Sequence, residues 1–265
     1  MKQFRQSTHL LLALASTICL LSCAVAQHPA AAESTTVAEQ YLLSAANQER
    51  AARNLPLLHR DPQLARAAAQ HAQAMAAHGS ISHQFPGEAA LASRGASMGV
   101  AFNRISENVA EAPSAVQIHD MWMHSEGHRA NLLDPAVDAV GIRVIARNGE
   151  LYAVEDFART VPSASLEEQE FAIRALIAQM GQIALATASD DTSAARLTCA
   201  KSTGFAGARK PTYVMRYTSS SLTQLPDEIK TRVASGHYHK AAVGACAGNT
   251  PTPFTSYNIA ILLYP

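Results

Sequence analysis

The stretch from Trp122 to Pro135 constrains the fold more than any other part of the sequence. In it, Glu126 and His128 are separated by one glycine and lie between two segments with helical patterns. Residues two apart in a continuous α-helix point about 200° away from each other and cannot share a site. We therefore predict that Gly127 forms a turn between two helices, so that both side chains face one pocket. Pro135 is expected to end the second helix, because the residue before a proline disfavours the α conformation.

The N-terminus has the pattern of an export signal. Basic residues precede an apolar run from Leu10 to Leu21 and then small residues, which is typical of a secretory signal peptide, here residues 1–26. The run is too short to remain as a transmembrane helix. Ala24-Val25-Ala26 fits a cleavage site, whereas the four residues ending at Cys23 resemble the lipobox of bacterial lipoproteins. The protein is therefore expected to be secreted or periplasmic. The alternative is a lipoprotein anchored to a membrane through Cys23.

Charge and cysteine content narrow the class of protein further. Lys plus Arg equals Asp plus Glu at 21 each, without the clustered basic residues of a nucleic-acid interface, so we expect no nucleic-acid partner. In an exported chain, Cys199 and Cys246 are the pair left outside the leader and are expected to form a disulfide. Two unpaired buried thiols are the alternative. A bridge would stabilise the C-terminal part by very roughly 4 kcal/mol on the chain-entropy model.

Capping residues and periodicity predict the first elements of the chain. Residues 27–36 are small and polar and are interpreted as a linker. One helix is expected from about 37 to 54, after a capping box at Thr36, and a second from Pro62 to Gly79, after an N-cap aspartate. Asn148-Gly149 predicts a tight hairpin between two strands.

Several chemically suggestive residues also have a plain structural interpretation. His71, in the second helix, and His78, beside it, are expected to be solvent-facing or simply hydrogen-bonded. Gly95 to Gly99 matches the G-x-S-x-G text of serine hydrolases. That motif needs a strand before the serine and a helix after it, whereas here the preceding residues have the helical pattern. A strand from Ile105 to Ala110 places Glu107 between apolar neighbours. Burying it without a partner is costly, so this face is expected to be partly solvated unless Glu107 is paired.

These elements and motifs together resemble one known family. Residues 37–159 are similar to the CAP superfamily, the cysteine-rich secretory, antigen 5 and pathogenesis-related (SCP-like extracellular) proteins, in its compact bacterial form. The resemblance implies an α/β fold, an α-β-α sandwich, here without the several disulfides of eukaryotic members. Residues 160–265 lie outside it. The likeness is carried, in the family's order and spacing, by Asn47–Arg50, Leu57–Leu64, Ser82-His83, Glu107–Ala110, Trp122–Pro135 and Val140–Ile142.

The resemblance also implies a shared cleft lined by His83, Glu107, Glu126 and His128, the positions that match the family's tetrad. His83 and His128, as neutral imidazoles, can hold zinc or another divalent cation. The carboxylates can ligate the metal, orient a histidine or take a proton from a metal-bound water. Two nitrogens are fewer than the usual three protein ligands of a catalytic zinc site, so the metal is expected to bind weakly.

Three functions from different classes are compatible with such a tetrad. The first is an exported binding protein whose cleft accepts a lipid, a small apolar molecule or a peptide, with an optional divalent metal. The second is a structural polar cluster, with the function carried by surfaces at the cell envelope. The third is a metal-assisted, peptidase-like hydrolase with Glu107 or Glu126 as general base. The H-E-x-x-H motif is missing from the sequence, and we rank hydrolysis last.

Residues 160–265 predict a small α/β unit of no recognised family. A helix capped by Ser165 buries one apolar face, and Ser189 to Ser193 are interpreted as a polar break. Later segments predict strands and one further helix. His237 and His239 would share a face if extended, as a possible metal pair, although an exposed polar turn is favoured.

Overall fold

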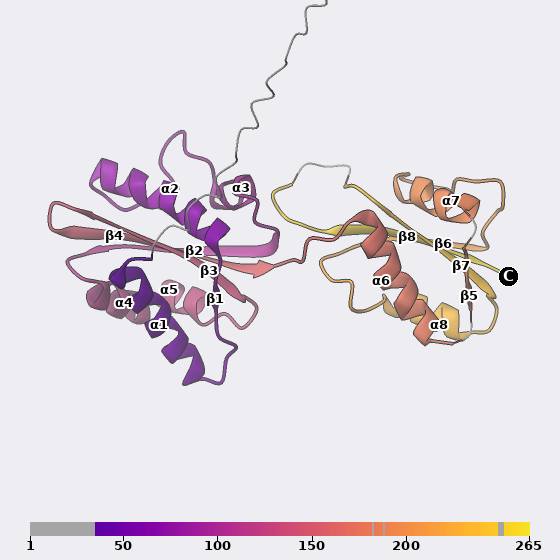
Figure 1. Ribbon diagram of the computed structural model, residues 1–265, viewed down its shortest axis with the longest axis horizontal. Helices are drawn as coiled ribbons and strands as arrows, with labels where there is room; N and C mark the ends of the chain where they lie inside the picture. Colours follow the sequence, from indigo (N-terminus) through magenta and orange to yellow (C-terminus); the bar gives the residue numbers. More distant parts are fainter. Residues whose placement is uncertain (1–34, 182, 188, 249–251) are drawn as a thin grey trace, which may run out of the picture. The chain divides into compact units, whose positions relative to one another are not determined.

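The computed structural model describes residues 35–181, 183–187, 189–248 and 252–265 (Figure 1). The predicted signal peptide, the lipobox cysteine and all but the last two residues of the predicted linker lie outside the described residues. Within the described chain there are two four-stranded sheets. One belongs to the N-terminal region, residues 35–161, and the other to the C-terminal region, residues 162–265.

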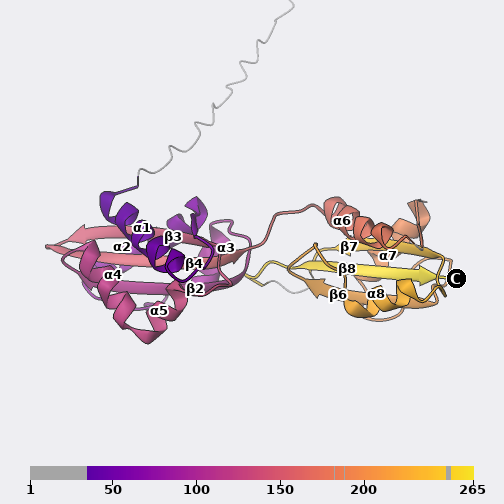
Figure 2. The same ribbon diagram turned by 90° about the horizontal axis from the view of Figure 1, so that it is seen from below.

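The N-terminal region has the three-layered α-β-α architecture that was predicted. Its elements are α1 (Val37–Ala51), β1 (His59–Arg60), α2 (Pro62–His78), α3 (Leu91–Ser97), β2 (Phe102–Ala112), α4 (Ala115–His124), α5 (Glu126–Leu132), β3 (Ala139–Arg147) and β4 (Glu150–Thr160). The sheet has the order β1-β3-β4-β2, in which β1 is parallel to β3 and the other neighbours are antiparallel. Helices α1, α4 and α5 cover one face, and α2 and α3 cover the other (Figures 1 and 2).

Local sequence signals set the ends of these elements. Thr36 and Glu39 form a reciprocal capping box at the start of α1. The Asp61 side chain accepts two backbone N–H groups at the start of α2, and Gly79 ends the helix with a left-handed φ of 65°. Asn148 and Gly149, with φ of 53° and 87°, join β3 and β4. Positive φ at both residues matches the right-handed twist of the paired strands.

The α2 helix is held unusually close to the sheet. A Cβ atom added to Gly141 of β3 would lie 2.1 Å from the carbonyl carbon of Leu64, so only glycine allows this approach. On the opposite face, Trp122 is fully buried, and its indole N–H donates to the carbonyl of Val109 at 3.1 Å. The segment that follows α2 carries His83, so the close packing of α2 determines where that imidazole can lie.

The break between α4 and α5 lies at Ser125, and the expected turn at Gly127 is wrong. Ser125 has extended φ and ψ of −92° and 122°, and α5 begins at the next residue. Gly127 lies inside α5, with open space where a side chain would be. Glu126 and His128 therefore sit two residues apart on one helix. Their side chains point in different directions, because residues two apart on an α-helix are about 200° apart around its axis.

The C-terminal region is a smaller α/β structure, as predicted. Its elements are α6 (Leu166–Gln179), β5 (Ala184–Leu185), α7 (Ser189–Cys199), β6 (Tyr213–Ser219), α8 (Asp227–Ala234), β7 (Lys240–Cys246) and β8 (Tyr257–Tyr264). The sheet order is β5-β7-β8-β6. The apolar side chains of α6 and α8 pack on one face of it, and those of α7 on the other. No helix in the described parts of the chain is long and apolar enough to cross a bilayer.

The interpretation of Ser189 to Ser193 as a polar break is wrong, because these residues form the first turns of α7. Acidic side chains in the first turn complement the helix dipole. The buried face of α7 consists mainly of small residues such as Ala194 and Ala195, which give no strong apolar periodicity in the sequence. Cys199 at the end of α7 is bridged to Cys246 at the end of β7, the disulfide that was expected.

The two sheets share one connectivity. In each, a short first strand runs parallel to the third, the third is antiparallel to the fourth, and the fourth is antiparallel to the second. Gly244 on β7 repeats the close contact of Gly141, since a Cβ there would lie 2.2 Å from the carbonyl carbon of Ala195 on α7. These glycines give a fixed point for comparing the two sheets residue by residue.

Candidate functional site

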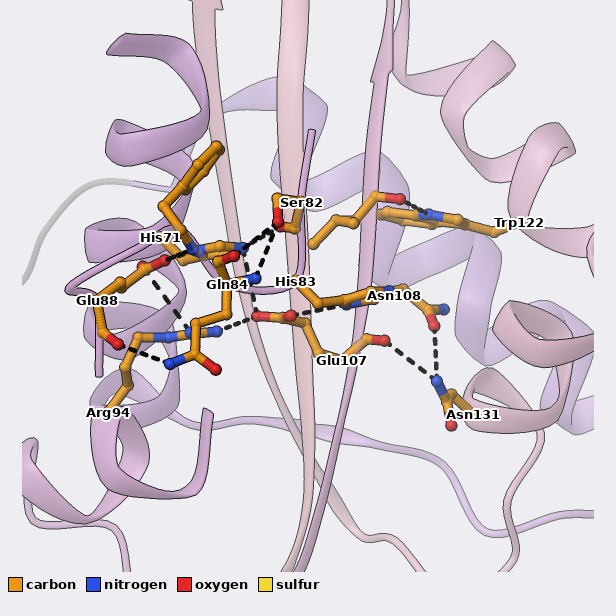
Figure 3. Close-up of polar contacts among 12 residues, drawn as sticks. His71, Ser82, His83, Gln84, Glu88, Arg94, Glu107, Asn108, Trp122 and Asn131 are labelled. Carbon is orange, nitrogen blue, oxygen red and sulfur yellow. Dashed lines mark hydrogen bonds and ion pairs between the residues drawn. The ribbon is translucent and has the colours of Figure 1, made fainter. Parts of the chain in front are cut away.

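An exposed imidazole is held by a buried carboxylate at the centre of the candidate site. The His83 side chain, between α2 and α3, is 60% exposed, whereas that of Glu107 on β2 is 3% exposed. His83 Nδ1 donates a hydrogen bond to Glu107 Oε1 at 2.9 Å (Figure 3). This hydrogen bond selects the Nδ1–H tautomer of the neutral ring, because the carboxylate can only accept. The lone pair of Nε2, on the opposite side of the ring, is then available to a metal or to a donor on a ligand.

Glu107 is buried and paired, so the alternative of a partly solvated strand face is wrong. Arg94 of α3, 2% exposed, donates from Nη2 to Glu107 Oε2 and forms an ion pair with it. Asp156 lies opposite Glu107 on β4. Burial, and next the negative charge of Glu107, raise the pKa of Asp156 well above its ordinary value. Both effects favour a proton on Asp156, which leaves Glu107 as the carboxylate that Arg94 compensates.

His71 of α2 is fully buried and lies within hydrogen-bonding distance of an acceptor at each ring nitrogen. Nδ1 is 2.7 Å from Glu88 Oε1, and Nε2 is 2.6 Å from the carbonyl oxygen of Ser82 (Figure 3). Ser82 directly precedes His83, so α2 holds the backbone from which the exposed imidazole projects. His71 is hydrogen-bonded, one of the two outcomes expected from the sequence, but the sequence indicated neither Glu88 nor Arg94 as its neighbours.

His128 on α5 lies beside His83. The centroids of the two rings are 6.3 Å apart, with the ring planes tilted by 45°. The Asn108 amide donates to the carbonyl of His128 at 3.0 Å. Asn131 in turn donates to Asn108 Oδ1 at 3.1 Å (Figure 3). Burial, and next the neighbouring His83, lower the pKa of His128. Both effects favour the neutral imidazole of His128, which has a lone pair to offer a ligand.

Glu126 is the member of the predicted tetrad that lies apart. It is exposed at the first position of α5. Among the described residues, no hydrogen bond or ion pair joins it to His83, Glu107 or His128. It lines a hollow of about 540 Å³ together with Arg104, Arg129, Ala130, Asn131, Leu133, Asp134 and Pro135. The structure thus brings three of the four predicted side chains together.

A second hollow, of about 550 Å³, begins two residues before His83. Ile81 and Met121, each 47% exposed, are its large apolar side chains. The remaining lining residues are Glu111, Ala112, Pro113, Gln117, Asp120 and Glu150. Four of the eight lining residues are polar, three of them acidic, so this hollow combines apolar surface with negatively charged groups.

Comparison with known families decides which fold family the N-terminal region represents. The model of the cysteine-rich secretory protein family, CAP, matches residues 43–157. Residues 43–157 form a CAP domain. This domain contains every described element from the body of α1 to β4, including the three side chains that converge at the site.

The bacterial proteins that resemble this chain each match less than half of it. An uncharacterized protein of Bacillus subtilis (strain 168), YkwD, is 28% identical over 113 residues, which are 42% of this chain and 44% of the relative. An extracellular SCP-domain protein from Bacillus anthracis is 31% identical, with 46% of this chain and 40% of that chain covered and a TM-score of 0.43. An outer surface protein from Borrelia burgdorferi is 21% identical, with coverages of 48% and 96% and a TM-score of 0.45. This chain therefore spans less than half of the first two relatives.

The described residues contain no group of three or more His, Cys, Asp or Glu side chains placed to hold a metal ion. In the CAP domain this leaves His83 and His128 as a pair of imidazoles. In the C-terminal region, His237 and His239 are exposed and lie outside any strand, in the segment after Gly236. Ser97 lies in α3 rather than after a strand, and its hydroxyl donates to the carbonyl of Arg94.

Proposed function

We propose that this protein is an exported binding protein whose CAP domain binds a lipid, a small apolar molecule or a peptide beside His83 and His128. The observation that carries the proposal is the hydrogen bond from His83 Nδ1 to Glu107, whose other oxygen is engaged by Arg94. It leaves an exposed imidazole with its second nitrogen unused and a neutral imidazole next to it. Such a pair can accept hydrogen bonds from a ligand or coordinate a metal.

A divalent cation such as zinc fits this site as a weakly held accessory. His83 and His128 supply nitrogen ligands of the kind zinc prefers, and the carboxylate behind His83 orients the ring as outer-shell partners of zinc ligands do. Among the described residues, no third His, Cys, Asp or Glu side chain is placed to complete a metal site. Glu126 lies two residues from His128 on the same helix, a spacing that does not aim both side chains at one site. When bound, the metal would attract an anionic or carbonyl oxygen of a ligand.

The hollow beside Ile81 and Met121 supports an apolar component in the ligand. Both side chains are nearly half exposed. Ile81 lies in the segment that carries His83, and Met121 lies on α4, the helix before the one that carries His128. Covering them would remove apolar surface from water, which favours binding by about 25 cal/mol per Å².

Hydrolysis is the less supported function, because Glu107 is poorly suited to be a general base. Its two oxygens are engaged by His83 and Arg94, and its side chain is almost fully buried. A general base must reach the proton that it abstracts. Glu126 is accessible but has no partner among the three converging side chains that would orient it.

The proposal of export rests on the leader pattern and on the disulfide. The bridge between Cys199 and Cys246 belongs to the kind of bond that persists in oxidising compartments and is rare in the cytosol. Anchoring through Cys23 remains the alternative route to the cell envelope.

Calorimetric titration of the purified protein tests the binding function. Zinc chloride and, separately, a fatty acid and phospholipid vesicles would be titrated into the wild type and into His83→Ala/His128→Ala. His59→Ala is the matched control, because His59 is an exposed histidine on β1 of the same domain. We expect heat with the wild type and the control and its loss in the double variant. Equal heats in all three proteins, or none in the wild type, would contradict the proposal.

A further inference from the structure

The predicted tetrad does not explain how His83 is kept in place. This imidazole projects from the segment between α2 and α3, outside regular secondary structure, and most of its side chain is in solvent. Its Nδ1 hydrogen bond alone leaves the backbone of that segment free to move. The buried groups behind it, on α2 and α3, supply the missing constraints (Figure 3).

We propose that His71 and Arg94 are positioning residues for the binding site: His71 fixes the backbone next to His83, and Arg94 fixes the carboxylate that orients its ring. This inference rests on the proposed function, because its purpose is to keep Nε2 of His83 available to a ligand. It goes further by assigning the geometry of the site to two residues that no ligand would touch.

The contact of His71 with the Ser82 carbonyl requires a hydrogen on Nε2 of its ring. The Ser82 carbonyl oxygen carries no hydrogen, so Nε2 of His71 must donate to it. On the other side, Glu88 also accepts from the backbone N–H of Phe85 at 3.0 Å and lies 3.8 Å from Arg94 Nη1. Burial acts to raise the pKa of Glu88, but these hydrogen bonds and charges lower it overall. The ring of His71 is thus held on one side by the Ser82 carbonyl and on the other by the Glu88 carboxyl, 2.7 Å from Nδ1.

Arg94 completes this arrangement through the second carboxylate. It contacts both Glu107 and Glu88, and its Nη1 also donates to the carbonyl of Ala89 at 3.2 Å. Arginine stays protonated at all physiological pH values and offers several donors in a fixed plane, so it can hold Glu107 at a defined angle. His71 Nε2 lies 3.9 Å from Glu107 Oε2, the oxygen that Arg94 also contacts. The two positioning residues thus share both of their carboxylate partners.

A purely structural role for this network makes a different prediction from a positioning role. Removing one partner of a buried ion pair leaves an uncompensated buried charge and destabilises a protein strongly, whatever the function of the pair. A positioning role requires in addition that the tautomer of His83 changes when the network is cut, in protein that remains folded. Side-chain nitrogen-15 spectra of histidine report which ring nitrogen carries the hydrogen, and they need no ligand.

The test compares Arg94→Met, Arg94→Lys, His71→Leu and His71→Gln with the wild type. Arg94→Lys keeps the charge and His71→Gln keeps one donor, so these variants retain part of the network and are the more certain to fold. His119→Leu is the control, because His119 is also a nearly buried histidine of the CAP domain but lies on α4 outside the network. Each protein is examined without metal by histidine nitrogen-15 spectroscopy, and then by zinc titration and by thermal unfolding.

We expect the Nδ1–H tautomer of His83 in the wild type and in His119→Leu. Arg94→Met and His71→Leu should give a mixture of tautomers and bind zinc about tenfold more weakly or worse, as is typical when an outer-shell partner of a metal ligand is removed. The lysine and glutamine variants should lie between these limits. Wild-type His83 spectra in the folded lysine and glutamine variants, whatever their melting temperatures, would overturn the proposal. A tautomer change with no zinc binding by the wild type would instead retain the positioning role and count against the metal in the proposed function.

Discussion

Next to Gly141, the N-terminal sheet has Asp156 on its neighbouring strand, preceded by Glu155. Next to Gly244, the C-terminal sheet has Ala260, preceded by Ile259. All four of these β4 and β8 residues are buried. Two sheets of one connectivity therefore fill equivalent positions with carboxyl groups in one case and with hydrocarbon in the other. An α/β sheet of this kind needs no buried carboxyl group, so the carboxyls of the CAP domain require a separate explanation.

The position of Glu107 gives part of that explanation. Its counterpart, opposite Ala260, is Arg216, which donates from Nε to the carbonyl of Thr198 at 2.7 Å on α7. In the C-terminal region this position ties a strand to its covering helix, whereas in the CAP domain the equivalent carboxylate holds His83. The comparison indicates that the fold itself needs only a contact between strand and covering helix at this position. In the CAP domain the same position carries the carboxylate that orients His83.

Glu155 shows the cost of this addition. It is fully buried in the layer under α1 and α4, and neither of its oxygens has a hydrogen-bond partner among the described residues. Burial raises its pKa to about 8. Its counterpart Ile259 packs in an apolar cluster with β7, α6 and α8. We therefore expect a carboxyl placed at position 259 to lower stability, and removal of the carboxyl of Glu155 to raise it.

The largest effect is expected when a carboxyl is placed in the C-terminal sheet. Ile259→Glu should lower the free energy of unfolding of this region by about 5 kcal/mol at pH 8, if the new carboxyl has a pKa as high as that of Glu155, since each pKa unit is worth about 1.4 kcal/mol. Hydrogen exchange of the β7 and β8 amides, at pH 5 and pH 8, measures it. A loss of less than about 1 kcal/mol at pH 8 would break the comparison by showing that both sheets tolerate a buried carboxyl.

The next effect concerns the covalent bond that only the C-terminal region has. Replacing Cys199 and Cys246 together by alanine should lower its free energy of unfolding by about 4 kcal/mol, because the bridge closes a long loop in the unfolded chain. Urea unfolding followed by circular dichroism measures the change. The fluorescence of Trp122, the one tryptophan of the sequence, follows the CAP domain and serves as an internal reference. An unchanged C-terminal transition would show that this region needs no covalent support.

The shared glycine contacts should be equally sensitive in the two regions. Gly141→Ala and Gly244→Ala would each place a methyl group against the backbone of the covering helix, and each should destabilise its region by about 3 kcal/mol. Gly127→Ala is the control, since it has open space and lies in a helix, where alanine stabilises by about 1 kcal/mol. Thermal unfolding of the three variants measures this. A large cost at one glycine and none at the other would mean that the two sheets are not equivalent.

The smallest effect is expected when the CAP domain loses its unpaired carboxyl. The folded protein retains the Glu155 proton up to about pH 8, whereas the unfolded chain releases it near its ordinary pKa of about 4.3. The free energy of unfolding of the wild type should therefore fall as pH rises between these values. Glu155→Gln removes this slope and should stabilise the domain at pH 8 by about 2 kcal/mol, less than the full titration cost because a buried amide also lacks partners. Trp122 fluorescence in urea at pH 5 and pH 8 checks it. Parallel pH profiles of variant and wild type would show that Glu155 is charged in the fold.

Much of the fold could be predicted because its signals are local. The capping box at Thr36, the N-cap at Asp61 and the hairpin at Asn148-Gly149 depend on residues a few positions apart, and each lies where it was expected. The weak signals failed. Gly127 predicts a turn, whereas Ser125 interrupts the helices. Ser189 to Ser193 predict a polar break where α7 begins, because the buried face of α7 is made of small side chains that give no strong periodicity.

The sequence by itself determined the capped helices and the hairpin of the CAP domain, the paired cysteines and, through the motifs of a family, three of the side chains at the site. Only the tertiary structure decided that Glu126 stands apart and that His71, Glu88 and Arg94 lie behind His83. The reason is physical. A capping residue or a turn acts within a few residues of chain, whereas the contact of Arg94 with Glu107 depends on how α3 packs against β2. That packing follows from strand register and from the close approach at Gly141, which no local pattern in the sequence specifies.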